Sequence, residues 1–205
     1  MNEQLSFLRN WVSAPRRVAA IAPSGKALAA LITSSVSPGD APVIELGAGT
    51  GVFTRQLIER GVPEEQLALV EFGSSFARGL REAFPAARVL CMDAARLGDI
   101  ALFGGEEAGA VVSGLPLLSM PPLQVARIVR AAFARLRPGG AFYQFTYGPR
   151  CPVPRAILER FGLQAHYIGG TLANLPPAAV FRISRKPAAA EAFQPKQRSS
   201  IPGLL

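Results

Sequence analysis

A glycine-rich turn contains the first residues whose types and spacing could do chemistry. Residues 43–51 read V-I-E-L-G-A-G-T-G, so an apolar run leads directly into closely spaced glycines. The apolar run predicts a buried strand, and the glycines permit a tight turn that a ligand can approach closely along the backbone. The pattern predicts a cofactor site with contacts from Glu45, Gly47, Ala48, Gly49, Thr50 and Gly51.

Two features of this turn favour S-adenosylmethionine over a dinucleotide. Glu45 lies two residues before Gly47, where its carboxylate would repel a pyrophosphate and attract the ammonium of a methionine group. The glycines follow G-x-G-x-G, and Val52 stands where the dinucleotide pattern G-x-G-x-x-G needs its last glycine. We therefore expect S-adenosylmethionine as the cofactor.

Two further acids follow the next two apolar runs. Glu71 ends the second run, 20 residues after Gly51, and Asp93 ends the third. In a doubly wound fold a carboxylate at the first position can accept hydrogen bonds from the ribose hydroxyls, and the second is placed for the adenine amino group. One acid at a strand end is usually only a solvated charge, but three at consecutive strand ends predict one site.

Strand-like and helix-like segments must alternate to position these acids. Apolar runs predict strands, and segments with helical periodicity or helix-favouring composition separate them. Strands joined through helices form right-handed crossovers and a mainly parallel sheet. The expected fold is α/β: a Rossmann-like, doubly wound, mainly parallel seven-stranded sheet with helices on both faces. The expected strands are 42–46, 66–71, 88–92, 110–113, 142–147, 163–168 and 179–184, and the expected helices are 25–34, 54–60, 76–84 and 124–136.

The motifs together resemble those of class I methyltransferases over about residues 41–185. The matching segments are E-L-G-A-G-T-G, V-E-F, M-D-A, and L-R-P-G-G before the fifth strand. The resemblance implies that Glu45 and the glycine turn hold the methionine part of the cofactor and that Glu71 holds the ribose. Asp93 with Ala94 would bind the adenine, and Phe72 would pack on its ring.

Other segments resemble the small bacterial phospholipid N-methyltransferases. They are A-P-S at 22–24, V-S-G-L-P-L-L at 112–118, Q-F-T-Y-G-P at 144–149 and N-L-P-P-A at 174–178. The resemblance implies methylation of phosphatidylethanolamine and its methylated derivatives to phosphatidylcholine at a membrane surface. Ser24 and Ser113, which lie in two of these segments, are expected to add cofactor contacts.

Tyr147 is the candidate catalytic residue. It closes the predicted fifth strand, and in such folds the site opens at the carboxyl ends of the strands. Its hydroxyl could orient the acceptor amine, and its ring could hold a methylated, cationic product by cation–π attraction. A structural role, as an aromatic residue before the Gly148-Pro149 turn, is the alternative interpretation.

The N-terminal segment is predicted to be an amphipathic, membrane-binding helix. At about 100° per residue its apolar side chains fall on one arc. Such a helix with nearby arginines suits an anionic bilayer surface, and the net charge of +8 favours an anionic partner. Packing of the apolar arc on the domain is the alternative. The predicted membrane-binding residues are Leu5, Phe7, Leu8, Arg9, Trp11, Val12, Arg16 and Arg17.

We expect three regions along the chain. Residues 1–40 would form the N-terminal helical, interfacial segment, and residues 41–186 the methyltransferase domain that binds S-adenosylmethionine. Residues 187–205, rich in Pro, Ala, Gln and Ser, would be a flexible tail. No run of 18 uninterrupted apolar residues and no signal-peptide order occurs. The expected location is therefore cytoplasmic, peripheral to the inner face of the cytoplasmic membrane.

The composition argues against several other classes. Two cysteines and one histidine make a disulfide framework, a metal site and a histidine-based triad improbable. At the fourth strand Ser113 and Leu117 replace the asparagine and aromatic residue typical of adenine-N6 methyltransferases, so nucleic acid is an unlikely partner. An RNA adenine methyltransferase, favoured by the net charge, and a cofactor-binding adaptor without catalysis remain the alternatives.

Overall fold

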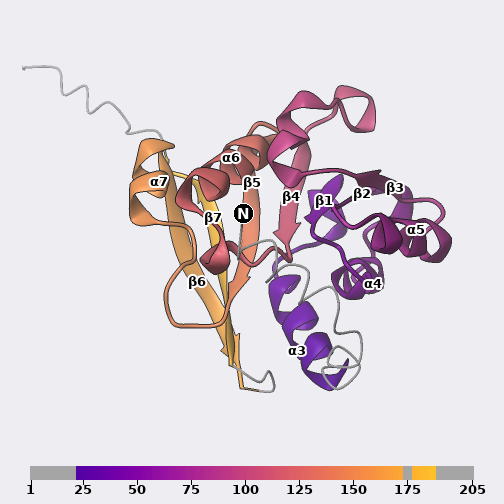
Figure 1. Cartoon of the computed structure of the whole chain (residues 1–205), viewed down its shortest axis with the longest axis horizontal. Coiled ribbons are helices and arrows are strands. Elements are labelled where there is room, and N and C mark those ends of the chain that lie inside the picture. Colours follow the sequence, from indigo (N-terminus) through magenta and orange to yellow (C-terminus); the bar gives the residue numbers. More distant parts are fainter. Residues whose placement is uncertain (1–21, 173–176, 188–205) are drawn as a thin grey trace, which may run out of the picture.

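The computed structural model describes residues 22–172 and 177–187, which form one sheet covered by helices on both faces (Figure 1). The strand order is β3-β2-β1-β4-β5-β7-β6. β1 to β5 pair in parallel, whereas β7 pairs antiparallel with both β5 and β6. The strands are β1 (Val43–Leu46), β2 (Leu67–Glu71), β3 (Arg88–Cys91), β4 (Ala108–Ser113), β5 (Leu136–Thr146), β6 (Leu163–Thr171) and β7 (Ala178–Arg185).

Two hydrophobic cores lie on opposite faces of this sheet. Since strand residues alternate between faces, Ile44 and Leu46 join one core and Val43 joins the other. The first core is completed by α6 (Pro122–Phe133) and α7 (Arg155–Arg160), and the second by α3 (Ala22–Ile32), α4 (Val52–Glu59) and α5 (Ser74–Ala83). The central strands are therefore buried on both sides, as their continuous apolar runs require.

The predicted fold is confirmed: the mainly parallel, doubly wound sheet has all seven expected strands. The predicted N-terminal amphipathic helix lies outside the described residues. Helix α3, which follows it, belongs to the body of the domain because Leu28 and Ile32 are buried in the second core. Within the described residues, no helix is both long and apolar enough to cross a bilayer.

The largest error in the predicted elements concerns the helix expected over 124–136. The structure ends this helix at Phe133 and starts β5 at Leu136, six residues before the predicted strand. Leu136 pairs with Ala108, and the register then shifts so that Ala110 pairs with Ala141. The segment Arg-Pro-Gly-Gly, residues 137–140, therefore lies within β5 but is not paired in register with β4. Helix α7 was also not predicted.

Candidate active site

The predicted cofactor residues lie at the carboxyl ends of β1, β2, β3 and β4. In an open α/β sheet this edge is where ligands bind, between the loops that leave neighbouring strands. β1 lies between β2 and β4, so the loops after these three strands are neighbours in space. The sheet order thus gathers residues 45–51, 71–72, 93–94 and 113 at one edge.

The glycine turn has the backbone that its sequence predicted. Gly47, Gly49 and Gly51 have φ values of 70°, 54° and 76°, which side chains with a Cβ rarely adopt. The turn also lies very close to the loop after β4: a Cβ added to Gly114 would lie 2.8 Å from the Gly47 carbonyl oxygen. Gly47 N–H donates to the Val70 carbonyl at 2.7 Å, which fixes the turn to β2.

The Glu71 carboxylate is oriented by two backbone amides. Gly49 N–H donates to Oε2 at 2.9 Å, and Gly73 N–H donates to Oε1 at 2.7 Å. A carboxylate has about four acceptor positions, so both oxygens keep capacity for further donors. The arrangement fits a ligand with paired hydroxyl groups, such as the ribose of the predicted cofactor. It also fixes Glu71 to the glycine turn across the gap between β1 and β2.

Glu45 lies beneath the glycine turn and not in the open part of the site. Its side chain is 1% exposed, and Thr54 of α4 donates a hydrogen bond to Oε2 at 2.6 Å. Burial raises the pKa of Glu45 from 4.5 to about 8, an effect that the Thr54 hydroxyl opposes and the charge of Glu71 reinforces. The carboxyl group is therefore mostly protonated at neutral pH. The prediction that Glu45 attracts the ammonium of the cofactor stays a prediction.

The predicted adenine residues lie after β2 and β3. Asp93 caps the 3-10 turn Ala94–Asp99, because its Oδ1 accepts a hydrogen bond from Ala95 N–H at 2.9 Å. Ala94 is buried, and Phe72 has 77% of its surface exposed immediately after Glu71. The exposed ring leaves a free aromatic face beside the carboxylate. Stacking of adenine on Phe72 stays a prediction.

Ser113 and Gln144 lie on the two strands, β4 and β5, that separate β1 from β7 in the sheet. They are paired in register on β4 and β5, and both are fully buried. Ser113 Oγ accepts a hydrogen bond from Leu115 N–H at 3.3 Å, and Gln144 Nε2 donates to the Leu115 carbonyl at 2.9 Å. The backbone N–H and the carbonyl of Leu115 are therefore both hydrogen-bonded, which fixes the loop after β4. Gln144 Oε1 and the Thr146 hydroxyl have no hydrogen-bond partner within the described residues.

A chain of aromatic contacts connects the glycine turn to Tyr147. Phe53 lies beside Gly114, 3.6 Å from the Cβ that would be added there, and its ring meets Phe145 edge-on at 6.3 Å. The Phe145 ring in turn meets Tyr147 edge-on at 5.3 Å. Tyr147 is 46% exposed, and partial burial raises the pKa of its phenol above 10.0, so the hydroxyl keeps its proton at neutral pH. It can donate a hydrogen bond there.

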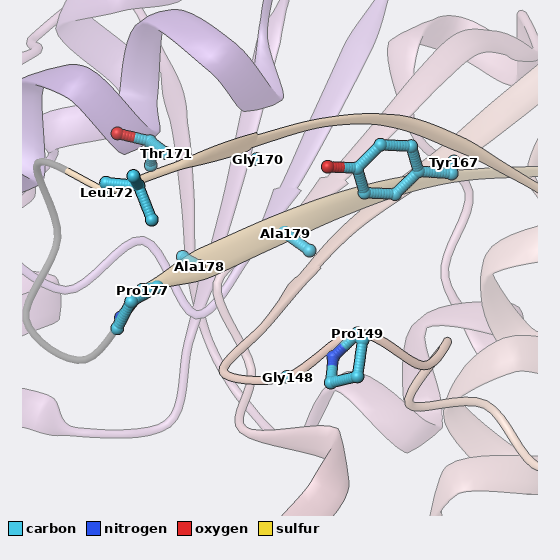
Figure 2. Close-up of a pocket in the computed structure, with 9 residues that line it drawn as sticks. All are labelled: Gly148, Pro149, Tyr167, Gly170, Thr171, Leu172, Pro177, Ala178 and Ala179. Atoms are coloured by element: carbon cyan, nitrogen blue, oxygen red, sulfur yellow. The ribbon is translucent and has the colours of Figure 1, made fainter.

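A pocket of about 680 Å³ lies beside the chain that follows Tyr147, which contributes Gly148 and Pro149 to its lining. Figure 2 shows the Tyr167 ring along β6 with its hydroxyl toward Gly170, while Gly148 and Pro149 lie opposite. Among the described residues that line it, this phenol is the one ionisable group. The residues that line it are Gly148, Pro149, Tyr167, Gly170, Thr171, Leu172, Pro177, Ala178 and Ala179.

Sequence reasoning missed Thr54, the amides that orient Glu71, and most of this pocket. Gln144, Gly148 and Pro149 belong to the Q-F-T-Y-G-P segment, so that motif was the available signal for them. The predicted membrane-binding residues lie outside the described residues, as does the side chain of Ser24. In the described part of the chain, no three His, Cys, Asp or Glu side chains form a group that could hold a metal ion.

Comparison with known proteins gives a consistent class. A family model described as a methyltransferase domain matches residues 43–140. The chain is 30% identical over 186 residues to an ornithine lipid N-methyltransferase of Singulisphaera acidiphila, covering 88% of this chain and 95% of that protein. A TehB-like SAM-dependent methyltransferase from Corynebacterium glutamicum shares its fold, with a TM-score of 0.61 at 14% identity over 88% of this chain and 99% of the other. The glycopeptide N-methyltransferase MtfA in complex with S-adenosyl-L-methionine also shares it, with a TM-score of 0.59 at 14% identity over 79% and 94%.

The chain belongs to the class I S-adenosylmethionine-dependent methyltransferases. Within this class it resembles the lipid N-methyltransferases, since the ornithine lipid N-methyltransferase matches it over 95% of that protein's length. The predicted family is thereby confirmed, and so is S-adenosylmethionine as the cofactor. The open glycine turn, the doubly anchored Glu71 and the exposed Phe72 fit that molecule.

Proposed function

We propose that this enzyme transfers methyl groups from S-adenosylmethionine to the amine of a membrane lipid headgroup. The proposed substrates are phosphatidylethanolamine and its methylated derivatives, and the final product is phosphatidylcholine. The reaction would take place at the inner face of the cytoplasmic membrane. The observation that carries the proposal is the match to an ornithine lipid N-methyltransferase over 95% of that protein.

The acceptor side of the site agrees with a lipid. The pocket after Tyr147 is lined by Pro149, Tyr167, Leu172 and Pro177 among others, and none of its described lining residues is charged. A nucleic acid acceptor would favour cations for its phosphates and an aromatic residue for base stacking at the end of β4. Leu117 occupies that part of the chain and is buried in the core. These features favour the lipid over the RNA alternative.

The chemistry requires positioning more than acid–base groups. S-adenosylmethionine supplies an electrophilic methyl group on a sulfonium. The unprotonated amine forms the new N–C bond while the S–C bond breaks, and the electron pair of that bond returns to sulfur. A dry site with the amine held in line supplies most of the rate. Glu71 and the glycine turn hold the cofactor side, and the loop that Gln144 fixes separates them from the acceptor.

Tyr147 is proposed to orient the amine. Its hydroxyl remains protonated because burial raises its pKa, so it can hydrogen-bond the neutral amine but is a poor base. The proton that the lipid ammonium must lose is therefore proposed to pass to water. The partly exposed ring could also hold each cationic, methylated product by cation–π attraction.

Ornithine lipid is the second candidate acceptor. The relative of this chain is named for that lipid, and like phosphatidylethanolamine it presents an amine on a membrane-embedded molecule. The catalytic step would be the same for either amine. The two candidates differ only in the headgroup that the acceptor side must recognise.

Vesicles with one amine lipid at a time distinguish these candidates. The purified enzyme would be incubated with radiolabelled S-adenosylmethionine and vesicles that contain phosphatidylethanolamine, ornithine lipid or only phosphatidylcholine. We expect labelled lipid with phosphatidylethanolamine and none with phosphatidylcholine, whose nitrogen has no free position. Label in ornithine lipid alone would transfer the proposal to the second candidate, and no labelled lipid in any vesicle would refute both.

A further inference from the structure

The exposed large apolar side chains of the described residues all gather at the carboxyl edge of the sheet. Two directly follow the carboxyl ends of β2 and β5, two lie in the connection that leaves β4, and two lie on or just after β6. β6 runs in the same direction as β5, because both pair antiparallel with β7. These residues are Phe72, Leu118, Leu123, Tyr147, Tyr167 and Leu172, with 46% to 88% of their surface exposed.

Single exposed apolar residues are normal on a protein surface, but a gathering on one side around a site indicates an interaction surface. The 3-10 turn Leu117–Ser119 presents Leu118 at 59% exposure although its neighbour Leu117 is buried. Leu123, in the first turn of α6, is 66% exposed, and Leu172 beyond the end of β6 is 88% exposed. In Figure 1 the β6–β7 hairpin extends beyond the carboxyl ends of β4 and β5.

The two edges of the sheet differ in their exposed acids. Exposed acids directly precede strands at the amino edge: Glu65 comes before β2, and Glu106 and Glu107 before β4. At the carboxyl ends of the described strands the acids are the buried Glu45 and the half-buried Glu71 and Asp93. The exposed charges there include the cations Lys26, Arg55 and Arg150. An anionic surface would therefore meet apolar groups and cations at this edge, whereas the other edge carries exposed acids beside the exposed cations Arg88, Arg160 and Arg185.

The described chain also begins at this edge. Gly25 of α3 lies against Val52 at the start of α4, and Thr33 accepts a hydrogen bond from Arg60 at the other end of α4. Helices α3 and α4 are therefore parallel, and both begin where β1 ends. The first described residues of the chain thus lie at the edge that carries the exposed apolar residues.

We propose that the carboxyl edge of the sheet is the face that rests on the lipid bilayer, so that a lipid amine reaches the active site without leaving the membrane. This inference rests on the proposed function and adds which surface of the domain meets the lipid. The apolar rim would lie in the headgroup region, Lys26 and Arg150 would face anionic headgroups, and the pocket beside Tyr147 would open toward the acyl chains.

Tryptophan reporters test the orientation without any need for turnover. Trp11, the single tryptophan, would be replaced by Phe, and one reporter introduced as Leu118→Trp at the carboxyl edge or as Ala101→Trp at the amino edge. Vesicles would contain phosphatidylethanolamine and phosphatidylglycerol with brominated acyl chains, which quench nearby indoles. We expect quenching of the first reporter only. Equal quenching of both, quenching of the second alone, or no quenching of either would overturn the proposal.

A second test uses Leu118→Asn with Leu123→Asn, which keep side-chain size but remove apolar surface. Loss of two apolar anchors should lower the initial rate on dilute phosphatidylethanolamine vesicles by about tenfold or more. The rate on a short-chain, monomeric phosphatidylethanolamine should be unchanged. Ala86→Asn with Ala101→Asn is the matched control away from this edge, and its vesicle rate should equal that of the wild type.

Different results would refute the docking face and the proposed function. An unchanged vesicle rate for the leucine double variant would overturn the docking face, although the enzyme would still be a lipid methyltransferase. If the wild type labels neither vesicles nor the monomeric lipid, the proposed function fails. The reporter experiment then still decides whether this edge binds lipid.

Discussion

Glu45 is a buried carboxyl group whose pKa is raised by folding. It lies at the end of β1, 1% exposed, with Thr54 as its hydrogen-bond donor. A buried carboxylate without a counter-charge is costly, so the side chain retains its proton up to about pH 8. A cation placed nearby would favour the ionised form of Glu45. The ammonium of the cofactor, if bound near Glu45 as predicted, would be such a cation.

The protein without cofactor should lose stability as the pH rises from 4.5 to 8. The unfolded chain ionises Glu45 near 4.5, whereas the folded protein keeps the proton to about 8, so folding binds a proton in this range. Each unit of the shift corresponds to about 1.4 kcal/mol. Urea unfolding of wild type and Glu45→Gln at both ends of the range measures the effect. The variant should lose less stability, and equal losses would contradict the raised pKa.

Glu71 should contribute directly to cofactor affinity. Glu71→Ala removes a charge-assisted hydrogen-bond acceptor, so binding of S-adenosylhomocysteine should weaken by about 1.5–3 kcal/mol in calorimetry. Gly49 N–H and Gly73 N–H would lose their partner as well, so thermal unfolding should be measured in parallel. Unchanged affinity in a folded variant would remove Glu71 from the site.

Tyr147 should affect turnover and not cofactor binding. Tyr147→Phe keeps the ring contact with Phe145 but removes the hydroxyl, worth about 0.5–1.5 kcal/mol as a hydrogen bond, so kcat should fall about threefold to tenfold. Tyr147→Ala also removes the ring that offers the cation–π contact, so its kcat should be lower still. If Tyr147 is only structural, both variants would lower the melting temperature and leave the kcat of the folded fraction unchanged.

At the scale of elements, local patterns located the cofactor half of the site and long-range pairing decided the rest. The β1 strand and its glycine turn were predicted because their signal lies within residues 43–51. The start of β5 could not be predicted, because Leu136 is extended only through its pairing with Ala108. The same holds for the hydrogen bond between Thr54 and Glu45, since two elements must pack before these side chains meet.

The acceptor pocket shows this limit most clearly. Its lining comes from the segment after β5, from β6 and from the start of β7, and these are joined only by antiparallel pairing. In the sequence, Tyr167 lies in the predicted strand 163–168, and no neighbouring residue indicates a role for it. The pocket exists because β7 returns between β5 and β6.

The N-terminal segment is predicted to bind anionic membranes through residues 4–17. Each basic residue near an anionic surface contributes about 1 kcal/mol, so replacement of Arg9, Arg16 and Arg17 by Glu should abolish co-sedimentation with phosphatidylglycerol vesicles. Added salt should weaken wild-type binding in the same direction. Cofactor affinity should not change, since none of the three belongs to the glycine turn.

A matched control carries the same change of charge elsewhere. Arg88, Arg127 and Arg160 are exposed, and their replacement by Glu lowers the net charge equally. This control should still sediment with the vesicles. If the N-terminal variant sediments as fully as the wild type, another surface provides the attraction.

At the scale of the whole molecule, the cofactor and the proposed lipid substrate would approach one edge of one sheet. The predicted cofactor residues lie at the ends of β1, β2 and β3, and the proposed acceptor pocket lies at the β6–β7 side, with the loop after β4 between them. Helices cover both faces of the sheet (Figure 1), so the cofactor site and the proposed acceptor pocket can both be reached from the carboxyl edge. This arrangement suits an enzyme that takes one substrate from solution and the other from a membrane.

The most direct measurement is a single reaction that offers both kinds of acceptor. Wild-type enzyme would receive labelled S-adenosylmethionine together with phosphatidylethanolamine vesicles and RNA, and the label would be located by product separation and mass spectrometry. We expect label on the headgroup nitrogen of the lipid, in successive methylated forms, and none in the RNA. Label in the RNA with none in the lipid would contradict the proposed function.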